Sequence, residues 1–255
     1  MAIYIQSGTG TGAGTEASPY FFEDEYSTAF AAAVADSSKL LIYKDGTYTW
    51  TNAIASDSNV GDVSNQITHK AENLHDAIFT HTGGLTGITG DPTLKWDSVK
   101  VVTVDHWAGY NNYKNHFILN SCHYISKKYS TFISLTATGT IFEPQLGDTS
   151  ATAMRIVTSS TNTLTNCTCI DRNNYASTYA AGYFFNGGTA KNCIFYATGS
   201  RSVGPFGSGA MTNCASFNVN TTGATITSDP QFVDSPNGDL RLRPSSPCIN
   251  AGTAS

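Results

Sequence analysis

The chain has 255 residues; Ser, Thr, Asn and Gly supply 102 of them, or 40%, whereas charged residues supply 13%. Small polar residues form helices poorly, so this composition excludes a helical bundle and favours an all-β chain. A formal net charge of -5 argues against a nucleic-acid partner, and no apolar run approaches the roughly 20 residues of a membrane span. With 40% apolar residues, the chain is expected to fold rather than stay disordered.

Residues 1–50 are predicted to form an N-terminal cap. A helix is expected over 22–36, with an acidic first turn and one apolar stripe made by Phe22, Tyr26, Phe30, Ala33 and Val34. Short strands are expected at 2–6 and 40–43. The start of the chain carries no basic segment followed by an apolar one, which predicts a protein made without a secretion signal.

A glycine-rich stretch between the first strand and the helix matches the sequence motif of a nucleotide-binding site. Gly8, Gly10 and Ala13 match the pattern G-x-G-x-x-A, and Asp45 follows the next strand. A dinucleotide site requires the helix to begin on the glycines, so that its amide groups face the pyrophosphate. Here Pro19 and about ten residues intervene, and no strand–helix alternation follows. We therefore expect a polar turn and no nucleotide.

Aromatic residues concentrate in the stretch 105–116, among Asn, His and Gly residues that favour a loop over a helix. A long loop that bulges from a repeat is a common place for a binding site. The candidate glycan-binding residues are Trp107, Tyr110, Tyr113 and His116. The alternative is that Trp107 and Tyr110 pack onto the repeat and fasten the loop.

Asn-Cys pairs recur along the C-terminal half. They lie at Asn166-Cys167, Asn192-Cys193 and Asn213-Cys214, with spacings of 26 and 21 residues, and a looser copy begins at Asn120. A period near 23 with short strands predicts a single-stranded right-handed parallel β-helix, of about eight coils over 51–228. Asn tolerates the left-handed backbone of a sharp turn and can form a ladder from coil to coil. The Cys that follows is expected to point inward.

The cysteines are predicted to be free, buried thiols. The C-x-C spacing at Cys167 and Cys169 is too short for a zinc knuckle, and no His lies beyond residue 123 to complete a site. A chain of this length does not need disulfides. We therefore expect no metal site.

Both ends of the chain resemble known proteins. The segments that carry the resemblance are Tyr4-Ile5-Gln6-Ser7-Gly8, Ser18-Pro19, Asp45-Gly46-Thr47-Tyr48, Ile67-Thr68-His69-Lys70-Ala71-Glu72-Asn73, Asp229-Pro230-Gln231-Phe232-Val233-Asp234, Asn237-Gly238-Asp239-Leu240-Arg241-Leu242 and Ser246-Pro247-Cys248-Ile249-Asn250-Ala251-Gly252. Together with the Asn-Cys repeat they resemble pectate-lyase-like parallel β-helix proteins, with 229–255 as the closing segment. Cys248 and Asn250 depart from the pattern of that segment. The resemblance implies one domain over 1–255, but that superfamily includes lyases, glycoside hydrolases, epimerases, bacterial surface proteins and phage tailspikes or fibres.

A polysaccharide lyase of this superfamily would need a base, commonly Arg or Lys, near acidic residues that hold calcium. Asp148 and Asp171 are one coil apart, with Arg172 and Lys191 nearby, but Asp171 also fits a solvated turn. Glu143 and Asp148 bracket a loop and form a second candidate pair, for a glycoside hydrolase.

Few acids and bases are present for such chemistry, and part of the weakly charged surface is expected to pack against another copy. Tyr175, Tyr179 and Tyr183 fit either a short helix or a subunit contact. The resemblance therefore implies a structural or adhesive virion component, namely a tailspike, fibre or decoration protein. We expect a homotrimer that is assembled in a host cytoplasm, contacts other virion proteins and host glycans, and needs no cofactor. The alternatives are an extracellular or cell-surface protein, or a polysaccharide lyase or glycoside hydrolase, with calcium only for a lyase.

Overall fold

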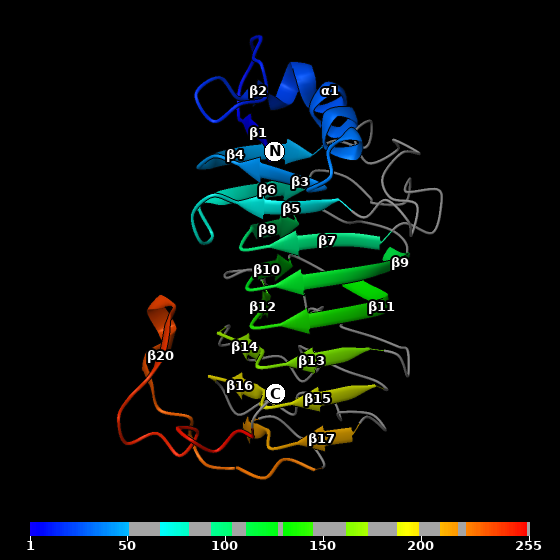
Figure 1. Cartoon of the computed structure of the whole chain (residues 1–255). Coiled ribbons are helices and arrows are strands. Elements are labelled where there is room, and N and C mark those ends of the chain that lie inside the picture. The colour runs from blue at the N-terminus through cyan, green and yellow to red at the C-terminus, as the bar shows by residue number, and fades with distance from the viewer. Residues whose placement is uncertain are drawn as a thin grey trace.

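The computed structural model describes residues 1–50, 67–81, 93–103, 111–126, 130–144, 162–172, 188–198, 210–218 and 223–253. Within them the chain is a stack of parallel coils (Figure 1). Sheet A contains ten strands, and sheet B contains eight. No helix in these ranges is long and apolar enough to cross a membrane.

From β3 onward, each coil contributes one strand to sheet A and the next strand to sheet B. Sheet A contains β1 (Ile3–Gln6), β2 (Tyr20–Phe21), β3 (Leu40–Tyr43), β5 (Thr68–Ala71), β7 (Thr93–Asp97), β9 (Asn111–Asn120), β11 (Ser130–Thr138), β13 (Thr163–Thr165), β15 (Thr189–Lys191) and β17 (Ala210–Thr212). Sheet B contains β4 (Gly46–Trp50), β6 (Ala77–His81), β8 (Lys100–Thr103), β10 (His123–Ser126), β12 (Ile141–Pro144), β14 (Thr168–Asp171), β16 (Ile194–Ala197) and β18 (Ala215–Phe217). Neighbouring strands are parallel throughout both sheets. The predicted parallel β-helix is confirmed, and its first strand pair, β3–β4, lies within the segment assigned to the cap.

A two-residue corner joins sheet A to sheet B in every coil from β7–β8 to β17–β18. Its first residue has a left-handed backbone with φ between 50° and 63°, and it is Ser98, Ser121, Gly139, Asn166, Asn192 or Asn213. Its second residue is buried inside the coil, and it is Val99, Cys122, Thr140, Cys167, Cys193 or Cys214. The left-handed conformation is costly for residues with a β-branched side chain, which explains why Asn, Gly and Ser occupy the first position.

In sheet A the inward side chains become smaller toward the C-terminal coils, whereas sheet B keeps aromatic residues such as Phe142 and Phe195 buried in its later coils. Aromatic residues fill the first coils, where Tyr43, Tyr48, Phe79 and Trp96 are buried. Farther along, the inward positions of sheet A hold Leu and Ala residues such as Leu164, Ala137 and Ala190. Side chains point inward and outward alternately along a strand. The inward-facing positions of a strand are therefore spaced two residues apart.

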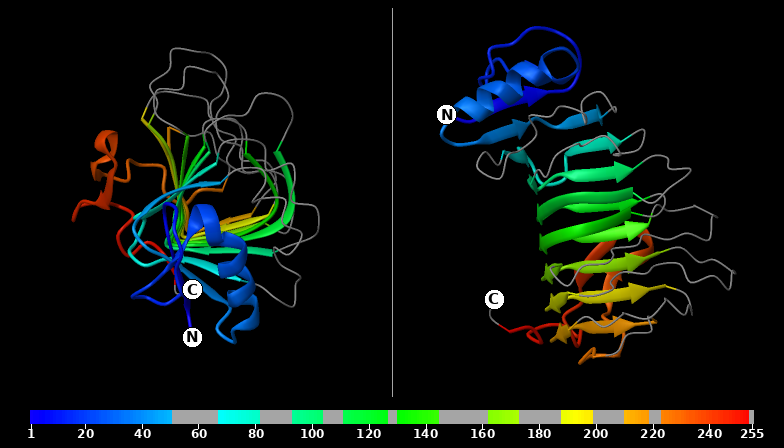
Figure 2. Two further views of the ribbon diagram at one scale, coloured as in Figure 1. Left: turned by 90° about the horizontal axis from the view of Figure 1, so that it is seen from above. Right: turned by 90° about the vertical axis from the view of Figure 1, so that its right-hand side faces the viewer.

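Helix α1 (Phe22–Ala35) lies across the N-terminal end of the stack (Figure 2). Its buried residues are Phe22, Tyr26, Ala29, Phe30 and Ala33. The ring of Phe22 packs edge-to-face on Tyr48, with ring centres 5.2 Å apart. The helix therefore covers apolar core that an open coil end would expose to water, as a cap is expected to do.

The glycine-rich stretch is bound by acids of this helix. The amide of Gly10 donates to the Asp24 carboxylate at 2.8 Å, and those of Gly12 and Phe21 donate to Glu25 at 2.8 and 3.0 Å. These carboxylates occupy the positions in which a nucleotide phosphate would have to lie, and their charge would repel it. The glycines thus hold a turn onto the cap.

The C-terminal residues close the last coil and then return along sheet B. Main-chain hydrogen bonds join Thr225 and Ile226 to Cys214, next to the last strand. β19 (Phe232–Asp234), a 3₁₀ turn (Ser235–Asn237) and β20 (Asp239–Leu242) form a hairpin beside the solenoid (Figure 1). Phe232 packs edge-to-face on Tyr196 of β16, with ring centres 5.2 Å apart. This segment covers part of the outer face of sheet B.

The buried His69 should make the stability of the fold depend on pH. It is fully buried in β5, with Nδ1 hydrogen-bonded to the Tyr43 hydroxyl at 2.8 Å, and burial lowers its pKa from 6.5 to about 4. The unfolded chain therefore binds a proton at this histidine between pH 6.5 and 4, whereas the folded chain does not. Stability should fall by up to about 3 kcal/mol as pH drops through this window. The free energy of unfolding, measured with urea at several pH values, should fall less with decreasing pH for His69→Gln than for the wild type. An equal dependence on pH in the two proteins would contradict this role.

Asn192 tests the corner geometry. Its side chain donates to Asn166 Oδ1 at 3.2 Å and to the Thr253 carbonyl at 2.8 Å, and it accepts from the Thr253 amide at 3.0 Å. Asn192→Gly should lose these bonds but keep the left-handed backbone. Asn192→Ala should be less stable than Asn192→Gly by about 1 kcal/mol in urea unfolding, because Ala resists positive φ. An equal loss of unfolding free energy in the two variants would show that the left-handed backbone at this position does not affect stability.

Candidate functional site

A buried carboxylate lies on the outer side of sheet B. His123 Nε2 and Glu143 Oε1 are 2.9 Å apart, and Arg172 donates to Glu143 Oε2 from Nε at 2.9 Å and from Nη2 at 2.7 Å. Only 4% of the Glu143 side chain is exposed. Both carboxylate oxygens are thus held by cationic or polar donors, which is what a buried charge requires.

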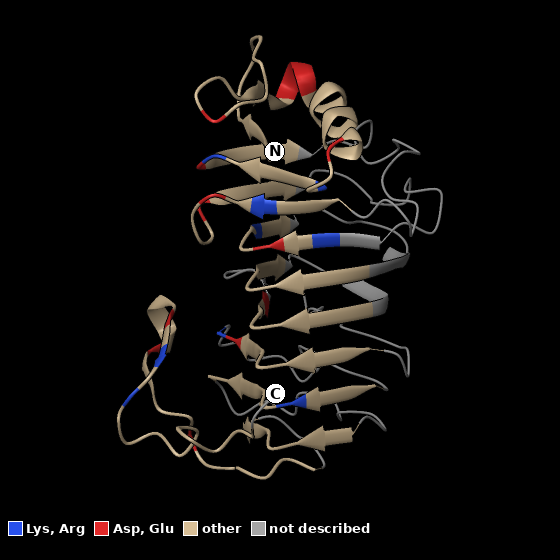
Figure 3. Ribbon diagram, in the orientation of Figure 1, with Lys and Arg blue, Asp and Glu red and all other residues tan. Residues whose placement is uncertain are grey.

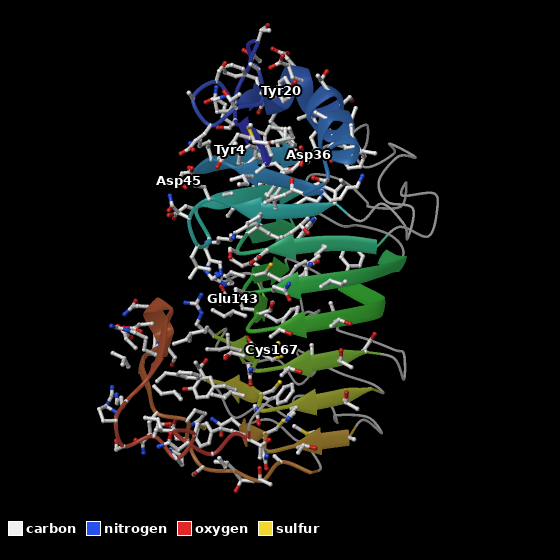
Figure 4. The ribbon with its side chains drawn as sticks, in the orientation of Figure 1. Tyr4, Tyr20, Asp36, Asp45, Glu143 and Cys167 are labelled. Atoms are coloured by element: carbon white, nitrogen blue, oxygen red, sulfur yellow. The ribbon has the colours of Figure 1, made fainter. Side chains whose placement is uncertain are left out.

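Three consecutive coils bring these residues together. Phe142 and Tyr124 point into the core, so alternation turns their neighbours Glu143 and His123 outward. Arg172 directly follows β14 and returns toward β12. Its Nη1 also donates to the carbonyl of Pro236 at 3.3 Å, which ties the network to the C-terminal segment near Glu143 (Figure 4).

The surroundings of Glu143 keep it ionised. Burial by itself raises the pKa of this carboxyl group. Hydrogen bonds from His123 and Arg172, together with the positive charge of Arg172, outweigh burial, so the pKa lies below its usual value. The network therefore carries a fixed negative charge between two basic groups at neutral pH. Chemically, it can orient an imidazole and hold the C-terminal segment.

The predicted catalytic cluster does not assemble around Asp171. This residue is fully buried and shares a side of β14 with Cys169, which belongs to the core. Lys191 lies in β15 of sheet A, directly before a corner. Arg172 is bound to Glu143, and Asp148, also the partner of Glu143 in the predicted hydrolase pair, lies outside the described residues. The one-coil spacing of Asp148 and Asp171 therefore does not predict which way their side chains point. The alternation of side chains along the strand decides that direction.

Sequence reasoning missed His123 as the partner of Glu143. The two are 20 residues apart, and a signal was present in the corner that ends at Cys122, because a strand of sheet B starts after each corner. Aligning Thr140 with Cys122 places Glu143 two positions beyond His123 in the next coil. The absence of an Asn-Cys pair at Gly139-Thr140 concealed this register.

Strand β9 begins at Asn111, within the stretch 105–116 predicted to be a loop. Trp107 and Tyr110 lie outside the described residues, as do Tyr175, Tyr179 and Tyr183. Tyr113 and His116 belong to strand β9, which pairs with β11 from Asn111 onward. The expectation of a loop through residue 116 is therefore wrong, because the parallel ladder overrides the turn preference of the Asn residues there.

The Asn-Cys repeat marks the corners, with one change of register. Asn166, Asn192 and Asn213 have the left-handed backbone, and Asn192 bonds to Asn166. Asn120 instead ends strand β9, and Ser121 occupies the left-handed position in that coil. Asn120 is thus not a member of the ladder, because the looser copy has one extra residue between Asn and Cys.

The corner cysteines are buried thiols without disulfides, as expected. Cys122, Cys167, Cys193 and Cys214 are at most 1% exposed, and all six cysteines are free. Each of these thiols donates to a carbonyl two residues earlier. The hydroxyl of Thr140 makes the equivalent bond to Thr138 at 3.2 Å. Burial raises the pKa of Cys122 to about 12, so this thiol stays protonated and unreactive at neutral pH.

A second surface lies on the outer face of sheet A. In the last five coils the outward positions align in two rows, which we call the Thr face. The rows are Ile118, Thr136, Thr163, Thr189 and Ala210, and Asn120, Thr138, Thr165, Lys191 and Thr212. Lys191 is the one charged residue among these ten positions, and the charges of Figure 3 lie mainly on the cap, the first coils and the C-terminal segment. Such rows present methyl and hydroxyl groups at the strand spacing of about 4.8 Å.

Glu143→Gln tests the buried network. The neutral amide leaves Arg172 buried without a counter-charge, so urea unfolding at pH 7 should show a loss of at least about 2 kcal/mol. Because the folded-state pKa of Glu143 is lowered, its contribution is complete above the ordinary carboxyl pKa. The difference from wild type should therefore shrink as pH falls below that value. Asp239→Asn, in an exposed pair with Arg241, should change little, and an equal effect of both variants would contradict the assignment.

Comparisons with known proteins add no relative. No family model, no curated protein and no solved structure matches the chain. The strand pairing of the chain itself identifies the fold. It is a parallel β-helix with a helical cap at its N-terminal end.

Proposed function

We propose that this protein is a structural or adhesive virion component, namely a tailspike, fibre or decoration protein, and that it works as a homotrimer. The observation that carries the proposal is the Thr face. Its aligned outward residues hold one charge in ten positions over five coils. Desolvating a charge is costly, so protein interfaces exclude charged residues from their centres. In the trimer the Thr faces of three copies point toward a common axis.

The closed ends of the solenoid support this proposal. α1 covers the first coil, and the segment from 223 to 253 covers the last strand and runs back along sheet B. Capped ends prevent end-to-end growth of coils, so association is directed to the sides of the rod. The resemblance of both end segments to pectate-lyase-like proteins, a superfamily with phage tailspikes, points the same way. Trp107, Tyr110, Tyr113 and His116 remain the proposed contacts to host glycans.

The second candidate function is a polysaccharide lyase or glycoside hydrolase at the cell surface or outside the cell. The pairing of His123 with Glu143, next to Arg172, favours it, since an oriented imidazole is a common general base. Against it, Arg172 and Glu143 are nearly buried and bind each other as well as the C-terminal segment. A structural role accounts for both residues without a substrate.

The mass in solution tests the proposal. Light scattering should give three times the mass of one chain for the wild type. Thr189→Arg adds three positive charges beside the three Lys191 side chains that the proposed axis already holds, so this doubled repulsion should dissociate the trimer. The matched control Val233→Arg, on the exposed side of β19, should leave it intact. A wild-type monomer, or release of unsaturated products from an acidic polysaccharide, would contradict the proposal and favour the enzyme.

A further inference from the structure

Two histidines from different coils meet on the surface above the buried network. His75 lies in the turn between β5 and β6, and His123 begins β10. Their ring centres are 5.6 Å apart. His75 crosses the intervening coil, because its amide donates to Ser98 at 2.7 Å while its Nε2 lies 2.8 Å from the Ser121 carbonyl.

The hydrogen bonds of both rings select one tautomer. A carbonyl oxygen can only accept, so His75 Nε2 carries the proton that it shares with Ser121. The Glu143 carboxylate likewise accepts from His123 Nε2. In each neutral ring the lone pair is then on Nδ1. Neither Nδ1 has a hydrogen-bond partner in the described part of the chain, and His123 keeps 19% of its side chain exposed.

This arrangement resembles the way proteins prepare histidines for metals. A ligating histidine usually donates its other N–H to a backbone carbonyl or a carboxylate, which orients the ring and raises its basicity. His75 has the first kind of partner, and His123 has the second. Arg172 in turn holds the Glu143 carboxylate in place.

The distance between the rings allows one shared ion. A metal about 2 Å from a ring nitrogen lies about 3 Å from the ring centre, so two rings on one ion have centres at most about 6 Å apart. The observed 5.6 Å lies within this limit. In the described part of the chain no three His, Cys, Asp or Glu residues gather into a metal site, so the protein would supply two ligands and water the rest.

We propose that His75 and His123 bind one divalent transition-metal ion, such as Zn²⁺ or Cu²⁺, through their Nδ1 atoms. Imidazole suits these ions, and only the neutral ring can bind them. The positive charges of Lys100 and Arg172 are offset by Asp76 and Glu143. Such an ion would fasten the turn after β5 to a coil two levels away.

Calorimetric titration of the full-length protein with ZnCl₂, and separately with CuSO₄, tests the site. We expect one ion per chain, and His75→Ala should weaken binding by at least about tenfold. His75 is the variant of choice, because His123 also supports Glu143. His69→Gln is the matched control and should bind as wild type does, since His69 is fully buried and bonded to Tyr43.

A second measurement separates this site from the other histidines. Substoichiometric Cu²⁺ should broaden the proton magnetic resonance signals of the His75 and His123 rings before those of any other histidine. Absence of binding by the wild type would overturn the proposal. Equal affinity of wild type and His75→Ala, or first broadening at a different histidine, would overturn it as well.

Discussion

The hydrogen-bond ladder that continues through each corner is the interaction on which the structure depends. At the corners the amide of the left-handed residue donates to the next coil, as Ser121 does to Thr138 at 2.8 Å and Asn166 does to Lys191 at 3.0 Å. The carbonyl of the buried corner residue accepts from the next coil, as Cys122 does from Ile141 at 2.9 Å. Main-chain groups therefore stay paired where the chain changes sheet, and a buried unpaired group would be costly. A positive φ is what lets one residue turn the chain without a break in this ladder.

The corner also sets what the interior and the surface can hold. With only two residues in the turn, the second one must fit inside the coil, which explains why Cys, Thr and Val occur there. Their thiol or hydroxyl groups bond to carbonyls, so the small polar atoms are satisfied without water. On the outside, strict stacking places equivalent residues above one another. A run of Thr at one position becomes a flat face, and a charge is placed beside the charges of its neighbours.

Stacking likewise explains why the charged network forms where it does. His123, Glu143 and Arg172 come from three successive coils, and each is brought to the same side by alternation. His75 joins them from another coil through a main-chain carbonyl. The same residues that hold the C-terminal segment through Pro236 thus orient the imidazole pair above it. Glu143 thus contacts both His123, which faces His75, and Arg172, which holds the C-terminal segment.

Much of the fold follows from the sequence alone, because local rules decide it. Repeating Asn-Cys pairs predict the corners, the apolar stripe predicts α1, and the composition excludes helical bundles. Corners at Ser98 and Gly139 stay hidden, and the one at Ser121 is placed one residue too early, because several residue types tolerate the left-handed backbone and coil length varies. The partnership of Glu143 with His123 and Arg172, and the approach of His75 to His123, are decided only in the tertiary structure. These pairs depend on the register between coils, which main-chain hydrogen bonds set without regard to the spacing of the side chains in the sequence.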